Sequence, residues 1–169
     1  RKLGAKTETA GGDAAFDGDP NTFWYVGGRG RGANGRSHPH DLIITFTNAV
    51  AMNGVVLMNR QNDRDHAGDI HRYTLSVSAE GDTWRELLRG ELASTWNPQT
   101  ISFPQPVSAK QLKLTALSGF GNDATAALAE IAVQLSDTGL QDQGGAGVEY
   151  RRVGSTSTDI DEWDGAAPR

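Results

Sequence analysis

Apolar and polar residues alternate along several short stretches of the chain, and a period of two is typical of half-buried strands. In residues 41–50, Leu42, Ile44 and Phe46 fall on one face. Residues 52–60 form a mostly apolar run, which favours a strand buried on both faces. No window of useful length combines a helical period with capping residues. Strand-length segments between frequent turns predict an all-β fold, an antiparallel β-sandwich or jelly roll.

Three further stretches extend this pattern. Residues 73–87 predict a hairpin whose turn is Glu80-Gly81-Asp82. Residues 100–117 predict two strands separated by a turn that prolines bound, and residues 127–135 predict the last strand.

The strand pattern stops near Leu135. Residues 136–169 are rich in Gly, Ser, Thr and Asp, with few large apolar side chains. We therefore expect one module over residues 1–135, followed by a flexible linker over residues 136–169. The alternative is that residues 136–169 begin the next domain.

Composition narrows the possible functions. A net charge of -5 argues against a nucleic-acid surface, which needs a basic face. The chain has no cysteine, which excludes a disulfide, a thiolate nucleophile and a cysteine-based zinc site. No stretch is long and apolar enough to span a membrane, so we expect no membrane partner.

The stretch "AFDGDPNTFW", residues 15–24, places two carboxylates beside two aromatic residues that favour burial. Unpaired carboxylates near a core are costly, and a hard cation is the obvious compensation. The EF-hand pattern fails here, because its sixth place is Thr22 instead of Gly and its twelfth is Gly28 instead of Glu. A metal at this loop would therefore need a carboxylate from elsewhere in the chain.

Five stretches together resemble discoidin domains, also called coagulation factor five/eight type C domains. They are "AFDGDPNTFW", "NGVVLMNRQ", "GDIHRYTLSVSAEGDTW", "KQLKLTAL" and "AALAEIAV", in the family's order and spacing. The chain is most similar to the family 32 carbohydrate-binding modules, including the N-terminal sugar-binding domain of fungal galactose oxidase. The resemblance covers about residues 3–135 and implies a galactose-binding-domain-like jelly roll.

The resemblance also implies a structural calcium ion (Ca2+). The family holds it with a D-G-[DN]-x-x-T loop and an Ala-Glu pair on the last strand. Carried over, the implied ligands are the side chains and carbonyl groups of Ala14, Asp17, Asp19, Thr22, Ala129 and Glu130. Carboxylate, hydroxyl and carbonyl oxygens suit calcium. The alternative is that Asp17 and Asp19 only form an Asx-turn and that Glu130 is solvated.

Family members bind sugar on the loops at one end of the sandwich, with an aromatic ring against the sugar. The resemblance places Arg60 at the family's sugar-contacting arginine and Phe120 at its stacking ring, with Trp96 as a second loop aromatic. The alternative for Arg60 is a salt-bridged scaffold residue, and for both rings a position folded back over the core.

The chain departs from the galactose pattern at two places. Tyr25 stands where galactose binders often carry a histidine, and Ala67 where they often carry an asparagine. His66 and Asp65 are adjacent and are candidates to substitute. His38 and His40, two residues apart, are further candidates for reaching this end or for holding a transition metal.

The glycine-rich basic stretch of residues 29–40, called the basic loop, offers a different kind of ligand site. Arg29, Arg31 and Arg36 suit an acidic sugar such as a uronate, and the alternative is a solvated loop.

Enzymatic activity is not expected. Asp63, Asp65 and Asp69 lie in one acidic stretch instead of across a cleft, and G-x-S-x-G and H-E-x-x-H motifs are absent. We therefore expect a monomeric, non-catalytic module that binds galactose- or N-acetylgalactosamine-type glycans. We expect it to be joined to a catalytic or other domain of a secreted or cell-surface bacterial protein. The alternative is a structural spacer or a protein-binding discoidin domain without a sugar site.

Overall fold

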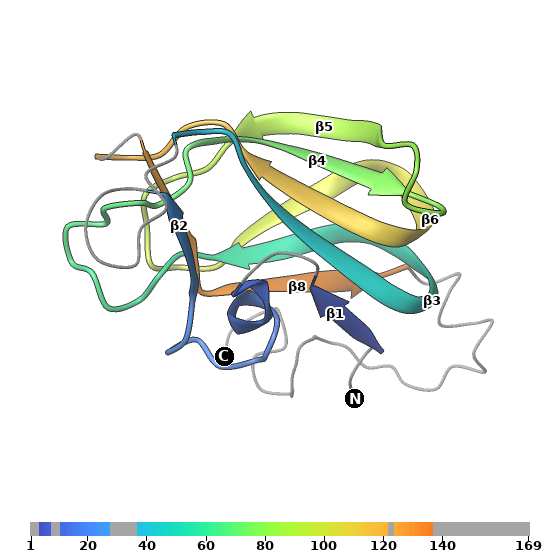
Figure 1. Ribbon diagram of the computed structural model, residues 1–169, viewed down its shortest axis with the longest axis horizontal. Helices are drawn as coiled ribbons and strands as arrows, with labels where there is room; N and C mark the ends of the chain where they lie inside the picture. Colours follow the sequence, from blue (N-terminus) through green and yellow to red (C-terminus); the bar gives the residue numbers. More distant parts are fainter. Residues whose placement is uncertain (1–3, 8–10, 28–36, 122–123, 137–169) are drawn as a thin grey trace.

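The computed structural model describes residues 4–7, 11–27, 37–121 and 124–136 (Figure 1). The pairs between its strands are antiparallel, and its one helical element is a single short 3-10 turn within these residues. The all-β prediction is thereby confirmed. The elements in chain order are β1 (Ala5–Thr7), η1 (Gly12–Ala15), β2 (Trp24–Gly27), β3 (His40–Met58), β4 (Arg72–Ser78), β5 (Arg85–Glu91), β6 (Gln99–Ala116), β7 (Thr125–Leu128) and β8 (Glu130–Leu135).

The sandwich is built on the two long strands β3 and β6, which bend and return in Figure 1. The first half of β3 pairs with the second half of β6, in a sheet of order β1-β3-β6-β4-β5. The second half of β3 pairs with the first half of β6 on one side and with β8 on the other. Strands β2 and β7 form a separate two-stranded sheet. Because β3 and β6 run through both layers, the layers share one core.

Two sequence predictions are wrong at the bends. The pattern predicts separate strands over residues 41–50 and 52–60, but both belong to the single strand β3, which has register shifts between Thr45 and Val50 and at Asn53. The predicted proline-bounded turn is likewise an irregular stretch inside β6, since Val107 pairs with Met52 and the next pair joins Ser102 to Gly54. The prolines fall in the unpaired residues between, where no N–H is needed.

The predicted last strand is also divided. Leu128 ends β7 and Glu130 begins β8, and only Ala129 lies between them. The Ala129 N–H donates to the Met58 carbonyl at 2.9 Å, so the chain passes at this point from the small sheet to the edge of the second layer. The bend places Glu130 at the start of β8.

The predicted hairpin of β4 and β5 is confirmed, with Leu75 opposite Leu88. The apolar side chains that alternate along the strands meet in one buried cluster, which begins at Ala15 and ends at Val133. The described residues include no helix of the length and apolarity that a membrane span requires. The predicted linker lies, apart from Ser136, outside the described residues, and the domain boundary stays a prediction.

Candidate functional site

The loop that follows η1, residues 16–22, is the acidic loop, and hydrogen bonds to its own carboxylates hold it in shape. Asp17 Oδ1 accepts the N–H of Asp19 at 2.8 Å, and Asp19 Oδ1 accepts the N–H of Asn21 at 2.9 Å. These are two consecutive Asx-turns, as one sequence alternative proposed. The turns leave the second oxygen of Asp17 directed at Thr22, whose Oγ1 lies 2.6 Å away.

Glu130 is buried and not solvated, because only 1% of the residue is exposed. Its two carboxylate oxygens lie 3.2 and 3.1 Å from the Gly18 nitrogen, so the start of β8 contacts the acidic loop. Burial raises the pKa of the Glu130 carboxyl well above its ordinary value, and the negative charges of Asp17 and then Asp19 raise it further, while the Gly18 N–H opposes them. Burial and neighbouring carboxylates both disfavour the charged form.

Oxygen atoms converge around the Thr22 hydroxyl. Its Oγ1 lies 3.2 Å from the Ala14 carbonyl oxygen and 3.0 Å from that of Asp19, in addition to the Asp17 carboxylate. A hydroxyl has a single proton to donate, so two of these three acceptors keep lone pairs directed at the same small space.

No group of three or more His, Asp or Glu side chains is arranged to hold a metal ion anywhere in residues 4–7, 11–27, 37–121 and 124–136. A cation at the acidic loop would therefore need carbonyl and hydroxyl oxygens beside the carboxylates. Such a mixed oxygen set suits calcium and gives a transition metal nothing it prefers.

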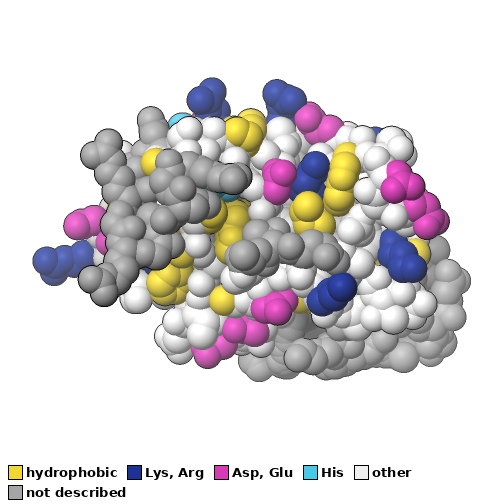
Figure 2. Space-filling view, viewed as in Figure 1, with side chains coloured by type: hydrophobic (Ala, Val, Ile, Leu, Met, Phe, Trp, Pro, Cys, Tyr) yellow, Lys and Arg dark blue, Asp and Glu magenta, His cyan; other side chains and the backbone are white. Residues whose placement is uncertain are grey.

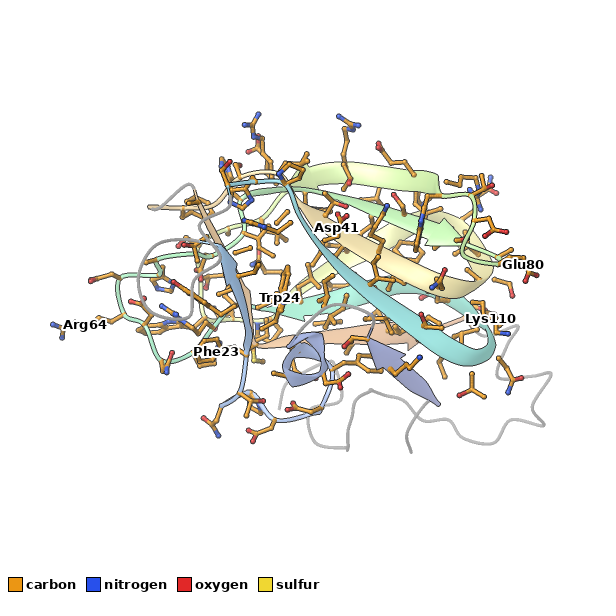
Figure 3. All side chains as sticks on the ribbon, viewed as in Figure 1. Phe23, Trp24, Asp41, Arg64, Glu80 and Lys110 are labelled. Carbon is orange, nitrogen blue, oxygen red and sulfur yellow. The ribbon has the colours of Figure 1, made fainter. Side chains whose placement is uncertain are left out.

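The other predicted residues gather at one end of the sandwich. Figure 3 places Phe23 and Arg64 toward this end, and Glu80 and Lys110 at the opposite end. We call it the loop end and define it as residues 59–71, 92–98 and 117–121 with Phe23 and Tyr25. Backbone hydrogen bonds tie these segments together: the Phe120 N–H donates to the Asp69 carbonyl at 2.8 Å, and the Leu92 N–H donates to the His71 carbonyl at 2.7 Å.

Arg60 lies just after β3 and is largely buried, with its side chain 14% exposed. Its guanidinium forms an ion pair with Asp63 and lies 5.1 Å from the ring centroid of Phe23 and 5.7 Å from that of Tyr25. The ion pair agrees with the scaffold alternative, and a sugar contact by Arg60 stays a prediction. Tyr25 itself is 44% exposed, so its ring lies open at this end.

His66 and Trp96 lie face to face. Their ring centroids are 4.9 Å apart with an interplanar angle of 29°, and Trp96 remains 45% exposed. His66 Nδ1 lies 2.8 Å from Asp69 Oδ2, which also accepts the Ser94 hydroxyl at 3.2 Å. The side chain of Asp69 therefore holds two residues of the loop end, His66 and Ser94, by hydrogen bonds.

Phe120 is less open than its glycine neighbours suggested. Its ring is half-buried and packs at 4.5 Å, tilted by 37°, against the ring of His71. His71 Nε2 in turn lies 3.3 Å from Glu91 Oε1. The two predicted stacking residues thus differ, because Trp96 offers more exposed ring than Phe120.

The histidine pair is engaged with the backbone. His40 is 5% exposed and its Nε2 lies 2.9 Å from the Ala124 carbonyl oxygen, while His38 Nδ1 lies 3.1 Å from that of Ala116. Their rings are 4.7 Å apart. These contacts give both residues a structural role, since they join the start of β3 and the residues before it to Ala116 and Ala124. The arginines of the basic loop, Arg29, Arg31 and Arg36, lie outside the described residues.

Sequence reasoning missed Asp69 and Ser94. It groups Asp69 with Asp63 and Asp65 in one acidic stretch and gives it no separate role, yet Asp69 is 1% exposed. A signal was present, because Asp69 directly precedes the buried Ile70 at the start of a strand-like run. Ser94 carried no signal, since its partner lies 25 residues away in sequence.

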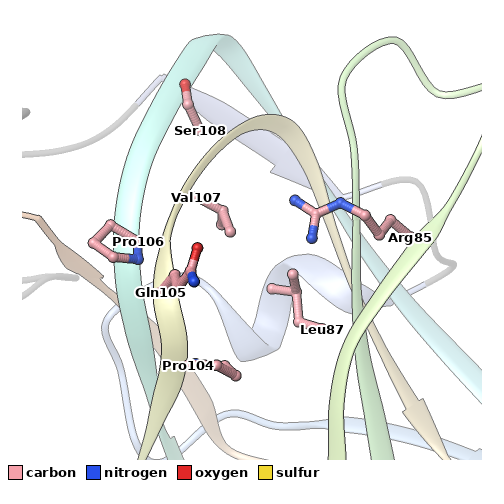
Figure 4. A pocket seen from close by; sticks show the side chains of 7 residues that line it. All are labelled: Arg85, Leu87, Pro104, Gln105, Pro106, Val107 and Ser108. Atoms are coloured by element: carbon pink, nitrogen blue, oxygen red, sulfur yellow. The ribbon is translucent and has the colours of Figure 1, made fainter.

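A pocket of about 420 Å³ lies elsewhere, between β5 and the irregular part of β6 (Figure 4). It is lined by Arg85, Leu87, Pro104, Gln105, Pro106, Val107 and Ser108, and it contains none of the predicted site residues. On the face drawn in Figure 2, described basic and acidic side chains are interspersed. That face of the described residues therefore presents no continuous basic stripe of the kind that binds nucleic acid.

The family follows from comparison with known proteins. A model of the F5/8 type C domain matches residues 4–131. The chain belongs to this family. The predicted recognition is confirmed, and the fold agrees with solved family 32 carbohydrate-binding modules.

Three solved structures illustrate that agreement. The module CpGH89CBM32-5 of Clostridium perfringens, in complex with GalNAc-β-1,3-galactose, is 24% identical with a TM-score of 0.65, covering 78% of this chain and 94% of its own. The family 32 module of C. perfringens NanJ, in complex with galactose, is 21% identical with a TM-score of 0.64, covering 78% and 92%. A C. perfringens ZmpB structure of two such modules and an M60 catalytic domain is 22% identical with a TM-score of 0.62, covering 86% of this chain and 15% of its own. At these identities the agreement concerns the fold.

Proposed function

We propose that this F5/8 type C domain is a non-catalytic carbohydrate-binding module whose glycan site is the loop end. The exposed indole of Trp96 is the observation that carries the proposal. One face of the ring lies on His66 and Trp96 is still 45% exposed, from which we infer that the opposite face is open to a sugar ring. An aromatic face surrounded by a few polar groups is typical of small-ligand sites.

The polar groups around this ring suit hydroxyl recognition. His66, Tyr25 and Arg60 present ring nitrogens, a phenol and a guanidinium at the same end of the sandwich. Phe120 adds a second, half-buried ring at this end. The galactose and GalNAc-β-1,3-galactose complexes of the NanJ and CpGH89 modules favour galactose-type glycans as ligands. Tyr25 and Ala67, which depart from the galactose pattern, make the exact sugar a question for experiment.

A glycan array on the domain, followed by titration of each hit, tests the proposal. We expect a galactose- or N-acetylgalactosamine-type sugar to bind weakly, with Kd of about 0.1–1 mM for a shallow site. Trp96→Ala, Arg60→Ala and Phe120→Ala should each weaken binding by about tenfold or more, because each removes a ring or a cation from the loop end. Isothermal titration gives the affinities.

Arg89→Ala is the matched control for Arg60→Ala. Arg89 pairs with Glu86 three residues away, as Arg60 does with Asp63, but it lies on the exposed strand β5. Binding that survives all three loop-end substitutions would place the site elsewhere. An array without any bound glycan would favour the spacer or the protein-binding alternative.

We also propose that the acidic loop holds a structural calcium ion. Its support is that the Asp17 carboxylate, the Thr22 hydroxyl and the Ala14 and Asp19 carbonyls converge. A bound ion would draw in the nearby carboxylates of Asp19 and Glu130. A bound calcium would compensate the negative charge of the buried Glu130 carboxylate. Elemental analysis of protein purified without chelator tests this, with about one calcium per chain expected. Calcium absent from protein that was kept in excess calcium would refute it.

The surrounding protein is the third part of the proposal. Family 32 modules occur beside catalytic domains, as in ZmpB, so we infer that this module is joined to a catalytic or other domain in a secreted or cell-surface bacterial protein. Its own role there is to hold the partner domain near glycan. We further infer a monomer. Light scattering of the domain, with a mass near 18.0 kDa expected, tests that inference.

A further inference from the structure

Asp69 is unusual among the acids of the loop end, because it is 1% exposed. One oxygen, Oδ2, receives both the His66 ring at 2.8 Å and the Ser94 hydroxyl at 3.2 Å. Asp69 therefore joins the 63–71 segment to the 92–98 segment through side chains. A buried carboxylate is retained only where such partners offset its desolvation.

The backbone around Asp69 is fixed from two sides. The Asp69 N–H donates to the His66 carbonyl at 3.1 Å, and the Asp69 carbonyl accepts the Phe120 N–H at 2.8 Å. The carboxylate is thus set in position by the tight turn and by the 117–121 segment. It is a fixed point from which a neighbouring ring can be oriented.

His66 takes an unfavourable backbone conformation to reach this fixed point. Its φ is 59°, in the left-handed region, and among the described residues it is the one non-glycine residue there. Left-handed residues without a local reason are uncommon, since Cβ approaches the following carbonyl. The bond to Asp69 and the stack on Trp96 supply the compensation here.

The stack gives the fixed ring a function. With centroids 4.9 Å apart, the imidazole covers one face of the Trp96 indole, and Trp96 as a whole remains 45% exposed. The Gln61 side chain holds the same segment by donating to the Trp96 carbonyl at 3.1 Å. The orientation of the indole therefore depends on His66, and that of His66 depends on Asp69.

Protonation changes one atom of this arrangement. An ionised carboxylate only accepts hydrogen bonds, so the N–H at Nδ1 of His66 donates to Asp69. The other ring nitrogen, Nε2, accepts a hydrogen bond when the ring is neutral and donates one when the ring is charged. Histidine makes this change near neutral pH. Other charged or titratable groups of the loop end are Arg60, Asp63, Arg64, Asp65 and Tyr25, and the Asp63 carbonyl accepts the His66 N–H at 3.0 Å. Burial raises the pKa of Asp69, and the His66 hydrogen bond and charge, Ser94 and Arg60 oppose it.

We propose that Asp69 is a positioning residue that fixes His66 beneath Trp96, so that the two rings form one glycan platform whose binding changes with the protonation of His66. The sugar part of this inference rests on the proposed function. The stacked unit itself, Asp69–His66–Trp96, is testable without a sugar.

Tryptophan fluorescence reports the unit, because a charged imidazole in contact with an indole quenches its emission. We expect the emission of the parent protein to fall as pH is lowered from about 8 to about 5. Trp96→Phe and His66→Gln should each remove this change. Asp69→Ala should reduce the change, because the acceptor that holds the His66 ring against the indole is lost.

Two controls separate this from a general structural effect. Ser94→Ala removes a hydrogen bond to the same carboxylate oxygen but leaves that oxygen as the acceptor for His66, so the change should keep its parental size. His71→Gln removes the more exposed pair of His71 with Glu91, whose imidazole contacts Phe120, and should leave the transition in place. A transition that persists in His66→Gln, or one that keeps its full size in Asp69→Ala, would overturn the unit.

Glycan binding at several pH values completes the test, using the sugar that the array identifies. The parent should show a severalfold change in Kd across the same transition, and His66→Gln should bind with a Kd that does not change with pH. A parental Kd that is independent of pH would overturn this inference and leave the proposed function standing. If the fluorescence unit is found but no glycan binds at any pH, the proposed function fails and the sugar part of this inference fails with it.

Discussion

Glu130 is a buried acid whose ionisation costs the fold stability. Its pKa is raised well above 4.5, first by burial and then by Asp17, so the native state binds more protons than the unfolded state above that pH. The free energy of unfolding therefore falls as pH rises from about 4.5 through the folded pKa of Glu130. In excess chelator, we expect the Tm to be lower at about pH 8 than at about pH 5. Thermal denaturation followed by circular dichroism measures it.

Glu130→Gln isolates this effect from that of Asp69, the other buried acid among the described residues. Asp69 also has a raised pKa and contributes in the same direction, so the useful quantity is the difference between parent and variant. The substituted amide keeps an acceptor for the Gly18 N–H but carries no charge. The Tm of the variant in chelator should depend less on pH than that of the parent. Equal pH dependence in the two proteins would show that Glu130 carries no ionisation cost.

At the scale of elements, the short pair β2–β7 supports the loop end. Gly27 closes β2 opposite Thr125, with φ of 83°. A Cβ on Gly27 would collide with the Ala124 carbonyl oxygen and lie 2.7 Å from His40 Nε2, where backbone cannot give way cheaply. Gly27→Ala should therefore lower the free energy of unfolding by about 2 kcal/mol or more, from clash and backbone strain together. Chemical denaturation measures the loss.

Gly11→Ala is the matched control for this substitution. Gly11 has a similar φ of 74°, but a Cβ there meets nothing within 4 Å. It should cost only the conformational part, about 1 kcal/mol. Equal losses in the two variants would mean that the contact with Ala124 carries no energy.

The elements also show what the sequence could predict and what it could not. The period of two along Leu42, Ile44 and Phe46 is a local property, and it predicted strands and core together. The continuity of β3 and β6 through their bends is not local, because it depends on pairing between residues far apart in the sequence, such as Val55 and Ile101. The alternation of residues therefore predicted two strands in each case, at places where the β3–β6 pairing only shifts its register.

The candidate site divides in the same way. The resemblance brought Arg60, His66 and Trp96 to one end, and the structure places them there. The role of Asp69 depends on burial that arises only when the 117–121 segment packs on it. In the sequence, Asp63, Asp65 and Asp69 lie close together among polar residues, which is typical of a solvent-exposed loop. The fold buries only the last of them.

At the scale of the whole molecule, the acidic loop and the last strand close the sandwich. The hydrogen bond from Gly18 to Glu130 joins residues 112 apart in the sequence, near the two ends of the buried core. This junction brings together like charges, so the two ends of the fold meet where they repel. A cation at this point would convert the repulsion into attraction between η1, the acidic loop and β8.

The proposed calcium ion should therefore act as a staple for the whole fold. Binding to the native state alone stabilises it by about 2.7 kcal/mol at a calcium concentration about 100 times Kd. For a domain of this size that corresponds to a rise in Tm of about 5–10 °C over protein in chelator. Magnesium should restore little of it, because its strict octahedral geometry and short bonds suit a carbonyl-rich set poorly. Glu130→Gln should show the smallest response to calcium, while Arg60→Ala, at the loop end, should keep the parental response. A Tm that calcium leaves unchanged in the parent would overturn the staple, since a cation that binds only the folded chain must stabilise it.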